Sequence, residues 1–183
     1  DVYKRQLHQS RTLVVSGRGK QDADLLIIGE GPGKNEDEEG LAFVGESGAL
    51  LNIMLDSVGL SSTYITNVVR CRPPNNRTPT KAECRSCRGF LQSEIALVKP
   101  KAILSLGKVA AKTILDSSGK FEKLMRKRHQ YFEYPVWVAY HPAYLLRQPQ
   151  LSEHSPKWEV WQVLCQVKLY LTRLKAERLK AKS

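Results

Sequence analysis

The sequence predicts an α/β fold in three layers, with a central four-stranded, mainly parallel sheet between helices. Short apolar runs rich in Val, Ile and Leu alternate along the chain with longer segments of helical periodicity. Unusual polar segments follow three of the four predicted strands, as happens when a site forms at the carboxyl edge of a parallel sheet. At 183 residues, the chain has the length of one domain with a substantial core.

The first half of the chain supplies two strands and two helices. The apolar run 25–28 predicts a strand over 24–29, and the leucines of 50–55 lie on one face of a helix over 47–58. A second strand is expected over 64–70. Pro79 then introduces a helix over 80–98.

The second half repeats the alternation. A strand over 101–106 ends at Gly107, and a short helix is expected over 108–116. A fourth strand over 134–140 is broken by Pro142, and a long helix runs from about 156 to about 175. Because strands joined by helical crossovers pair in parallel, we expect helices on both faces of one sheet. The chain is therefore predicted to be a single domain over 1–183, with a basic tail at 176–183.

The composition indicates a soluble protein with a polyanionic partner. No apolar run approaches the roughly 20 residues of a membrane span, so we expect a cytoplasmic, nucleoid-associated protein with no membrane partner. The 29 Lys and Arg residues exceed the 18 Asp and Glu residues, which gives a formal charge of +11. The basic residues gather within 70–88, 120–128 and 168–182, where they could grip a phosphate backbone. Their alternative role is to form solvated surface faces.

Three segments carry the chemistry. The loop 29–45 holds five glycines, one proline and several carboxylates, which is typical of a small-molecule pocket. Asn67 begins the segment NVVRCRPPNNRTP at 67–79, and the fourth strand leads into HPAYLLR at 141–147. Together with Glu36-Asp37 and Phe43-Val44-Gly45, these motifs resemble family 4 uracil-DNA glycosylases, the iron-sulfur branch of their superfamily, over roughly residues 7 to 170.

The resemblance implies a uracil-DNA glycosylase-like fold and a monomeric enzyme of base excision repair. Its substrate would be DNA containing uracil, from which it would release the base by hydrolysing the N-glycosidic bond of deoxyuridine. His141 would donate a hydrogen bond to O2 of the leaving uracil. Asn67 would read the base edge and Phe43 would stack on the flipped base. An ordinary structural role remains the alternative for each of the three.

The glycine loop would form one wall of this pocket. Glu30 is the expected catalytic carboxylate that holds the water or the developing sugar cation, and Asp37 is an alternative. Glu36 would exclude thymine by closing the space beside uracil C5. The remaining substrate-binding residues predicted here let the backbone approach the base and sugar, and they are Gly29, Gly31, Pro32 and Gly33.

Contacts with the DNA strand are expected from two further segments. Leu145 and Leu146 resemble the wedge that fills the gap left by an extruded nucleotide, and Arg147 follows them. The alternative for this tip is the start of an amphipathic helix. Arg72 and Arg77 would contact the DNA from the segment after the second strand.

The cysteines depart from the resembled family. Cys71 and Cys87 have the spacing of two ligands to a 4Fe-4S cluster, which needs four cysteine thiolates. The other pair should precede 7–12, but Val2 and Arg5 stand there, so we expect residues 1–6 to be a truncated or artefactual N-terminus. The chain as written would hold a cluster poorly or not at all. A second possibility combines Cys71 with the remaining cysteines, Cys84, Cys87 and Cys165, but we favour Cys84 as incidental and Cys165 as a core residue.

Two other functions remain open on the sequence alone. One is a DNA-binding module without activity, and the other is a glycosylase of the same superfamily with a different preference among deaminated bases. The retention of Glu30, Phe43, Asn67 and His141 favours an active enzyme over a binding module.

Overall fold

The predicted parallel strands form the centre of a mixed sheet. The computed structural model describes residues 7–125, 127–148 and 152–181. Within these residues the sheet has six strands in the order β1-β3-β2-β4-β6-β5. The four central strands are parallel, and they are β2 (Leu25–Gly29), β3 (Thr63–Asn67), β4 (Ala102–Leu106) and β6 (Tyr134–Ala139). The antiparallel edge strands β1 (Arg18–Gly19) and β5 (His129–Tyr131) are additions to the four strands expected.

The helices match the predicted positions, with short additions. The long helices are α2 (Glu46–Ser57), α3 (Lys81–Val98), α4 (Gly107–Ile114) and α7 (Pro156–Lys180). The short ones are α1 (Lys34–Glu39), η2 (Pro74–Asn76), α5 (Phe121–Met125) and α6 (Pro142–Leu145). The expected end of the last helix near residue 175 is wrong, because α7 continues through most of the predicted basic tail. No helix among the described residues combines the length and apolar character that crossing a bilayer requires.

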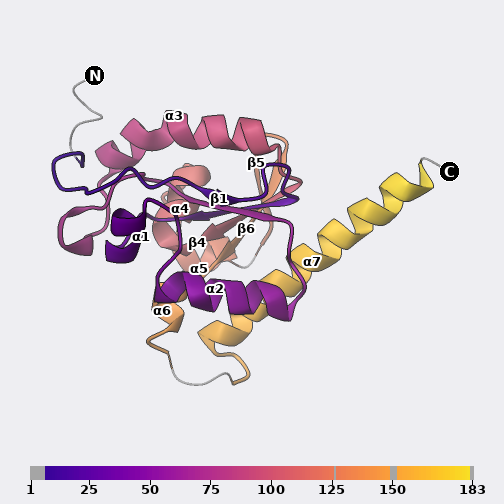
Figure 1. Ribbon diagram of the computed structural model, residues 1–183. Coiled ribbons are helices and arrows are strands. Elements are labelled where there is room, and N and C mark those ends of the chain that lie inside the picture. The colour runs from indigo at the N-terminus through magenta and orange to yellow at the C-terminus, as the bar shows by residue number, and fades with distance from the viewer. Residues whose placement is uncertain (1–6, 126, 149–151, 182–183) are drawn as a thin grey trace.

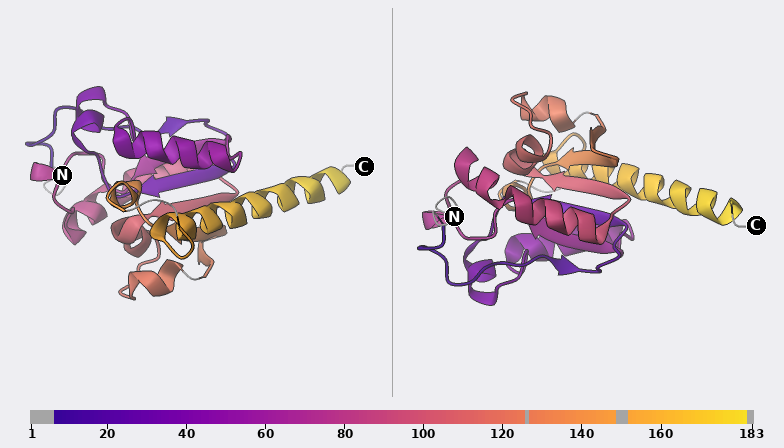
Figure 2. Two further views of the ribbon diagram at one scale, coloured as in Figure 1. Left: turned by 90° about the horizontal axis from the view of Figure 1, so that it is seen from below. Right: turned by 90° about the horizontal axis from the view of Figure 1, so that it is seen from above.

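Helices cover both faces of the sheet, as expected for a three-layer fold (Figure 1). Leu51 of α2 and Leu164 of α7 share one apolar cluster with Ile27 of β2. On the opposite face, Leu91 of α3 packs in a second cluster with Ile28. The alternation of Ile27 and Ile28 between clusters follows from the two-residue period of a strand. Figure 2 shows α2 and α7 on one face and α3 on the other.

The register of β2 and β3 sets the edge where the site forms. Gly29 pairs with Asn67 at the carboxyl ends of the two strands. Backbone hydrogen bonds continue past the strands, from Val68 N–H to Gly29 O at 2.9 Å and from Val69 N–H to Glu30 O at 3.3 Å. The glycine loop and the 67–79 segment therefore leave the sheet side by side.

A capping box anchors the start of α3. The Thr80 hydroxyl accepts the Glu83 N–H at 3.2 Å, and the Glu83 carboxylate accepts the Thr80 N–H at 2.7 Å. Arg77 donates to both carboxylate oxygens, at 2.7 and 2.9 Å. These hydrogen bonds, chiefly those from Arg77, lower the pKa of Glu83 from 4.5 to about 2. The end of the 67–79 segment is thereby tied to α3.

The lowered pKa of Glu83 predicts a pH-dependent contribution to stability. Because the folded state favours the ionised carboxylate, this contribution is complete above pH 4.5 and is lost as the pH falls toward about 2. In Glu83→Gln we expect a free energy of unfolding that is lower at pH 6 and falls less steeply between pH 4.5 and 2. Urea unfolding followed by tryptophan fluorescence measures both. Glu39→Gln, on an exposed residue, is the control, and a Glu83→Gln profile parallel to wild type would contradict the assignment.

Candidate active site

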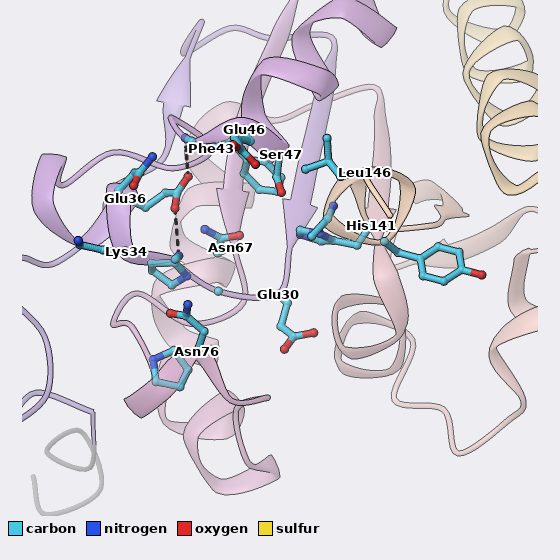
Figure 3. A pocket seen from close by; sticks show the side chains of 18 of the residues that line it. Glu30, Lys34, Glu36, Phe43, Glu46, Ser47, Asn67, Asn76, His141 and Leu146 are labelled. Atoms are coloured by element: carbon cyan, nitrogen blue, oxygen red, sulfur yellow. Dashed lines mark hydrogen bonds between the residues drawn. The ribbon is translucent and has the colours of Figure 1, made fainter. Parts of the chain in front are cut away.

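A cavity of about 710 Å³ lies at the carboxyl edge of the sheet. It collects side chains from the ends of β2, β3 and β6 and from the loops that follow them (Figure 3). Most of the predicted site residues line it, namely Glu30, Gly31, Pro32, Gly33, Glu36, Phe43, Asn67, Arg77, His141, Leu146 and Arg147. The structure thus brings together the three segments singled out in the sequence.

Asn67 presents a buried acceptor with no partner. It is the last residue of β3 and is only 2% exposed. Its Oδ1 atom has no hydrogen-bond partner among the described residues. A buried, unpaired amide oxygen costs on the order of 1 to 3 kcal/mol, which a bound donor would recover. Gly29 makes room for this side chain, since a Cβ atom there would lie 2.5 Å from Asn67 Oδ1 and 2.5 Å from Phe43 Cζ.

His141 is held as a neutral donor. It is the N-cap of α6, and its Nδ1 atom accepts the Ala143 N–H at 3.1 Å. With Nδ1 acting as acceptor, the proton of the neutral ring resides on Nε2. Removal of the ring from solvent is the main cause that lowers the pKa of His141 from 6.5 to about 4; the negative charge of Glu36 opposes this shift, and the positive charge of Arg147 adds to it. The imidazole is therefore uncharged at neutral pH, with an N–H available to a ligand.

Phe43 belongs to both the core and the cavity wall. Its side chain is 5% exposed and packs in the cluster beneath α2, and its ring centroid lies 5.6 Å from that of His141. Both expected roles, packing and pocket lining, are therefore compatible. The residue has a φ of 57°, in the left-handed region that a non-glycine residue rarely adopts. Strained backbone of this kind is concentrated at functional sites.

Gly48 makes this Phe43 conformation possible and was missed from the sequence. A Cβ atom on Gly48 would lie 1.8 Å from the Phe43 carbonyl oxygen. The first turn of α2 thus packs directly against the Phe43 backbone. Gly48 carries no functional group, so the only signal in the sequence was the presence of a glycine inside a predicted helix, where glycine is unfavourable.

The two carboxylates predicted as catalytic alternatives, Glu30 and Asp37, have different surroundings. Glu30 lines the cavity and is half-buried, which raises the pKa of its carboxyl group, while the Thr78 hydroxyl opposes this rise. Asp37 is 2% exposed, lies outside the cavity lining and accepts the Thr12 N–H at 2.9 Å. Of these two candidates, Asp37 is bonded to the backbone outside the cavity, and Glu30 lines the cavity.

Glu36 organises the loop from within the cavity wall. One carboxylate oxygen accepts the Gly33 N–H at 3.1 Å, and the other accepts the Val44 and Gly45 N–H groups at 3.0 and 2.9 Å. Figure 3 marks the hydrogen bonds from Gly33 and Gly45, which line the cavity with Glu36, as dashed lines. One side chain therefore joins Gly33, near the start of the loop, to residues 44–45 at its end.

After His141, Leu145 lies in the core and Leu146 lies at the surface. Leu145 is completely buried in the cluster shared by α2 and α7, so it cannot serve in an exposed wedge as predicted. Leu146 is 45% exposed and lines the cavity together with Arg147. The short helix α6 turns successive side chains to different sides, which separates the two leucines.

The three arginines of the 67–79 segment form hydrogen bonds or ion pairs with other side chains of the protein. Arg70 is 6% exposed and forms an ion pair with Glu94 of α3, so it is unavailable to a phosphate. Arg72 donates from Nε to Asn76 Oδ1 at 2.7 Å and lies outside the cavity lining. Arg77 lines the cavity while paired with Glu83.

The cysteines do not complete a four-thiolate site. Cys71 and Cys87 line a second cavity, of about 620 Å³, beside α3, where Arg11 donates to the Cys71 sulfur at 3.0 Å. Cys84 is buried in the core, and Cys165 lies on α7, across the sheet. The described residues contain no group of three or more His, Cys, Asp or Glu side chains able to hold a metal. Positions 2 and 5 lie outside the described residues and carry no cysteine, so the residues present do not fit a 4Fe-4S cluster.

The close approach of Gly48 to Phe43 predicts that Gly48→Ala is destabilising. The added methyl group requires α2 or the Phe43 segment to move, and such overpacking costs roughly 1 to 3 kcal/mol. Gly89→Ala is the matched control, because Gly89 lies within α3, a Cβ atom there would meet no heavy atom within 4 Å, and alanine should raise the helix propensity. Thermal unfolding by circular dichroism compares the two. Equal midpoints for Gly48→Ala and wild type would contradict the contact.

The comparisons with known proteins agree with this geometry. Residues 16–165 match the family described as "Uracil DNA glycosylase superfamily". The chain is 39% identical over 160 residues to the type-4 uracil-DNA glycosylase of Archaeoglobus fulgidus, covering 82% of this chain and 80% of that protein. It is 42% identical over 147 residues to the type-4 enzyme of Thermotoga maritima, covering 77% and 76%.

A more distant relative belongs to another branch. The type-5 uracil-DNA glycosylase of Thermus thermophilus is 32% identical over 132 residues, which cover 63% of this chain and 60% of that protein. Both the sequence identity and the share of each chain covered are higher for the two type-4 enzymes than for this type-5 enzyme. With its three-layer fold and the cavity at the carboxyl edge of the sheet, this chain belongs to the type-4 uracil-DNA glycosylases of the uracil-DNA glycosylase superfamily.

Proposed function

We propose that this chain is a DNA repair glycosylase that hydrolyses the N-glycosidic bond of deoxyuridine, releasing uracil and leaving an abasic site. The buried, unpaired Oδ1 atom of Asn67 is the observation that carries this proposal. Asn67 lines the cavity together with Phe43 and His141, which supply a stacking surface and a hydrogen-bond donor. A flipped uracil offers the three complementary features, namely a donor edge, a flat face and an acceptor that becomes negative.

Asn67 and Phe43 would recognise the base. The Asn67 Oδ1 atom would accept a hydrogen bond from uracil N3–H, and its amide nitrogen would donate to O4. Cytosine presents the reverse pattern at these positions, so its binding would leave the buried amide mismatched. Stacking on Phe43 is worth on the order of 1 to 3 kcal/mol for a base on an aromatic ring. Glu36 and the loop backbone would close the wall around the base.

His141 and Glu30 would act on opposite charges of the transition state. As the glycosidic bond breaks, negative charge collects on the uracil and positive charge on the sugar. The neutral His141 would donate from Nε2 to uracil O2, where the negative charge grows. Glu30 would hold the attacking water or stabilise the sugar cation, because its carboxylate faces the cavity and that of Asp37 is bound to Thr12.

DNA would approach across the rim of this cavity. Leu146 is the exposed apolar side chain that could fill the gap left by the flipped nucleotide, and Arg147 lies beside it. Arg77 and Arg72 would add positive potential near the backbone. Cys71 and Cys87 are the residues that would contribute to a cluster, and no step of the reaction is assigned to one. A monomeric state and a cytoplasmic location stay predictions.

The decisive experiment compares uracil-containing and matched thymine-containing oligonucleotides, single-stranded and duplex, followed by alkaline cleavage of abasic sites. We expect cleavage of the uracil strands only. His141→Ala should lower the rate about a hundredfold or more, because it removes a donor to developing charge. Cleavage at the level of the thymine control would instead favour a DNA-binding module without activity. Release of another deaminated base in place of uracil would favour a different lesion preference.

The shifted pKa values of Glu30 and His141 predict how the rate of uracil release falls at acidic pH. Because burial raises the pKa of Glu30, its carboxylate is neutralised first as the pH falls, whereas His141 stays neutral down to about pH 4. We therefore expect kcat to be insensitive to His141 protonation between pH 5 and 8 and to decline in acid through Glu30. Single-turnover rates measured from pH 4 to 8 test this. In Glu30→Gln the rate should be low and nearly independent of pH between pH 5 and 8, and an unchanged acid limb would exclude Glu30 as its source.

A further inference from the structure

We propose that Arg18 is a positioning residue that holds Phe43 in its base-stacking position. This inference rests on the proposed function, because it takes Phe43 as the stacking surface. Arg18 is not among the residues that line the cavity, and it belongs to the short edge strand β1. Its action would therefore pass through the backbone of the segment that carries Phe43.

Arg18 donates hydrogen bonds to two backbone carbonyl groups of the Phe43 segment. Its Nε atom donates to Ala42 O at 2.6 Å, and its Nη2 atom donates to Phe43 O at 2.9 Å. The same Nη2 atom donates to Asn52 Oδ1 of α2 at 3.2 Å. One planar guanidinium thus joins β1, the Phe43 segment and α2. A lysine would offer a single ammonium group without this fixed fork.

Glu36 holds the same segment by its N–H groups. It accepts from Val44 and Gly45, the two residues that follow those held by Arg18. Residues 42–45 are therefore held between a cation bound to two carbonyl groups and an anion bound to two N–H groups. Burial lowers the pKa of Arg18, and the negative charge of Glu36 opposes this effect by favouring the charged guanidinium. We call this four-contact arrangement the Phe43 clamp.

The clamp has a specific task because the Phe43 backbone is disfavoured. A φ of 57° is not retained by a phenylalanine unless its surroundings impose it. Release of the carbonyl groups would let the segment relax toward an extended conformation. The ring would then leave its place beside His141 and above the space next to Asn67. Loss of Arg18 should therefore act on the site only through Phe43.

A double-mutant cycle with Arg18→Met and Phe43→Ala tests this route. Methionine keeps much of the apolar length and removes every donor. We expect each single variant to lower kcat/KM for uracil release about tenfold or more, in line with the loss of base stacking. The double variant should match Phe43→Ala within about twofold, because the two residues act on one contact. The inhibition constant of free uracil should rise in parallel, since it reports the base contact without DNA.

Lys20→Met is the matched control. Lys20 is exposed and two positions from Arg18, so its loss makes the same change in net charge at the same edge of the sheet. It should leave kcat/KM unchanged. The salt dependence of DNA binding should be the same for Arg18→Met and wild type, whereas loss of a phosphate contact would reduce its slope by about one. Additive effects in the cycle, or a reduced slope, would overturn the proposal.

A crystal structure of Arg18→Met separates this inference from the proposed function. Displacement of the Phe43 ring from His141 supports the clamp even if the wild-type protein released no uracil, a result that would refute the proposed function alone. A Phe43 residue still at positive φ beside His141 would overturn the inference whatever the activity. If Arg18→Met does not fold, Arg18→Lys takes its place in the cycle and the crystal, with a partial effect that is again absent in the Phe43→Ala background.

Discussion

The parallel register of β2 and β3 sets Gly29 beside Asn67, and the cavity is built around that pair. Because the two strands end together, the glycine loop and the 67–79 segment diverge from one point with their polar groups facing each other. The absence of a side chain on Gly29 leaves the space occupied by the Asn67 amide and the Phe43 ring. A shift by one residue would turn Asn67 to the other face of the sheet, under α3. The recognition surface is thus a consequence of backbone pairing.

Charge is divided in this site between groups that hold the backbone and groups that face the cavity. Glu36 and Asp37 accept backbone N–H groups, and Arg18 donates to two backbone carbonyl groups and to the Asn52 side chain. Glu30 faces the cavity, and His141 is kept neutral by removal of its ring from solvent and by the Ala143 N–H. A rigid wall made by ionic hydrogen bonds avoids reorganisation when charge develops on a bound molecule, which is the general basis of electrostatic catalysis.

The sequence was sufficient for the central strands, because runs such as 25–28 and 102–104 are apolar on both faces and lie between helical segments. It could not reveal β1 and β5, whose two and three residues are too short to carry a period. Asn67 ends a parallel strand and His141 follows one, which placed these two residues near one another, and the family resemblance added Phe43 to the same pocket. Arg18 and Gly48 act through contacts with the Phe43 backbone, which no local pattern encodes. The same limit explains Leu145 and Asp37, whose orientation depends on packing across the fold.

The direction of α7 has a practical consequence. The helix begins near α6, close to the cavity, and runs away from it until its last turns project beyond the sheet at the opposite end (Figures 1 and 2). A 25-residue helix spans about 37 Å at 1.5 Å per residue, so Lys180 is carried far from the edge where a nucleic acid would dock. The molecule could be immobilised on a bead, or fused to a second enzyme, through that end while its open edge still faces solution.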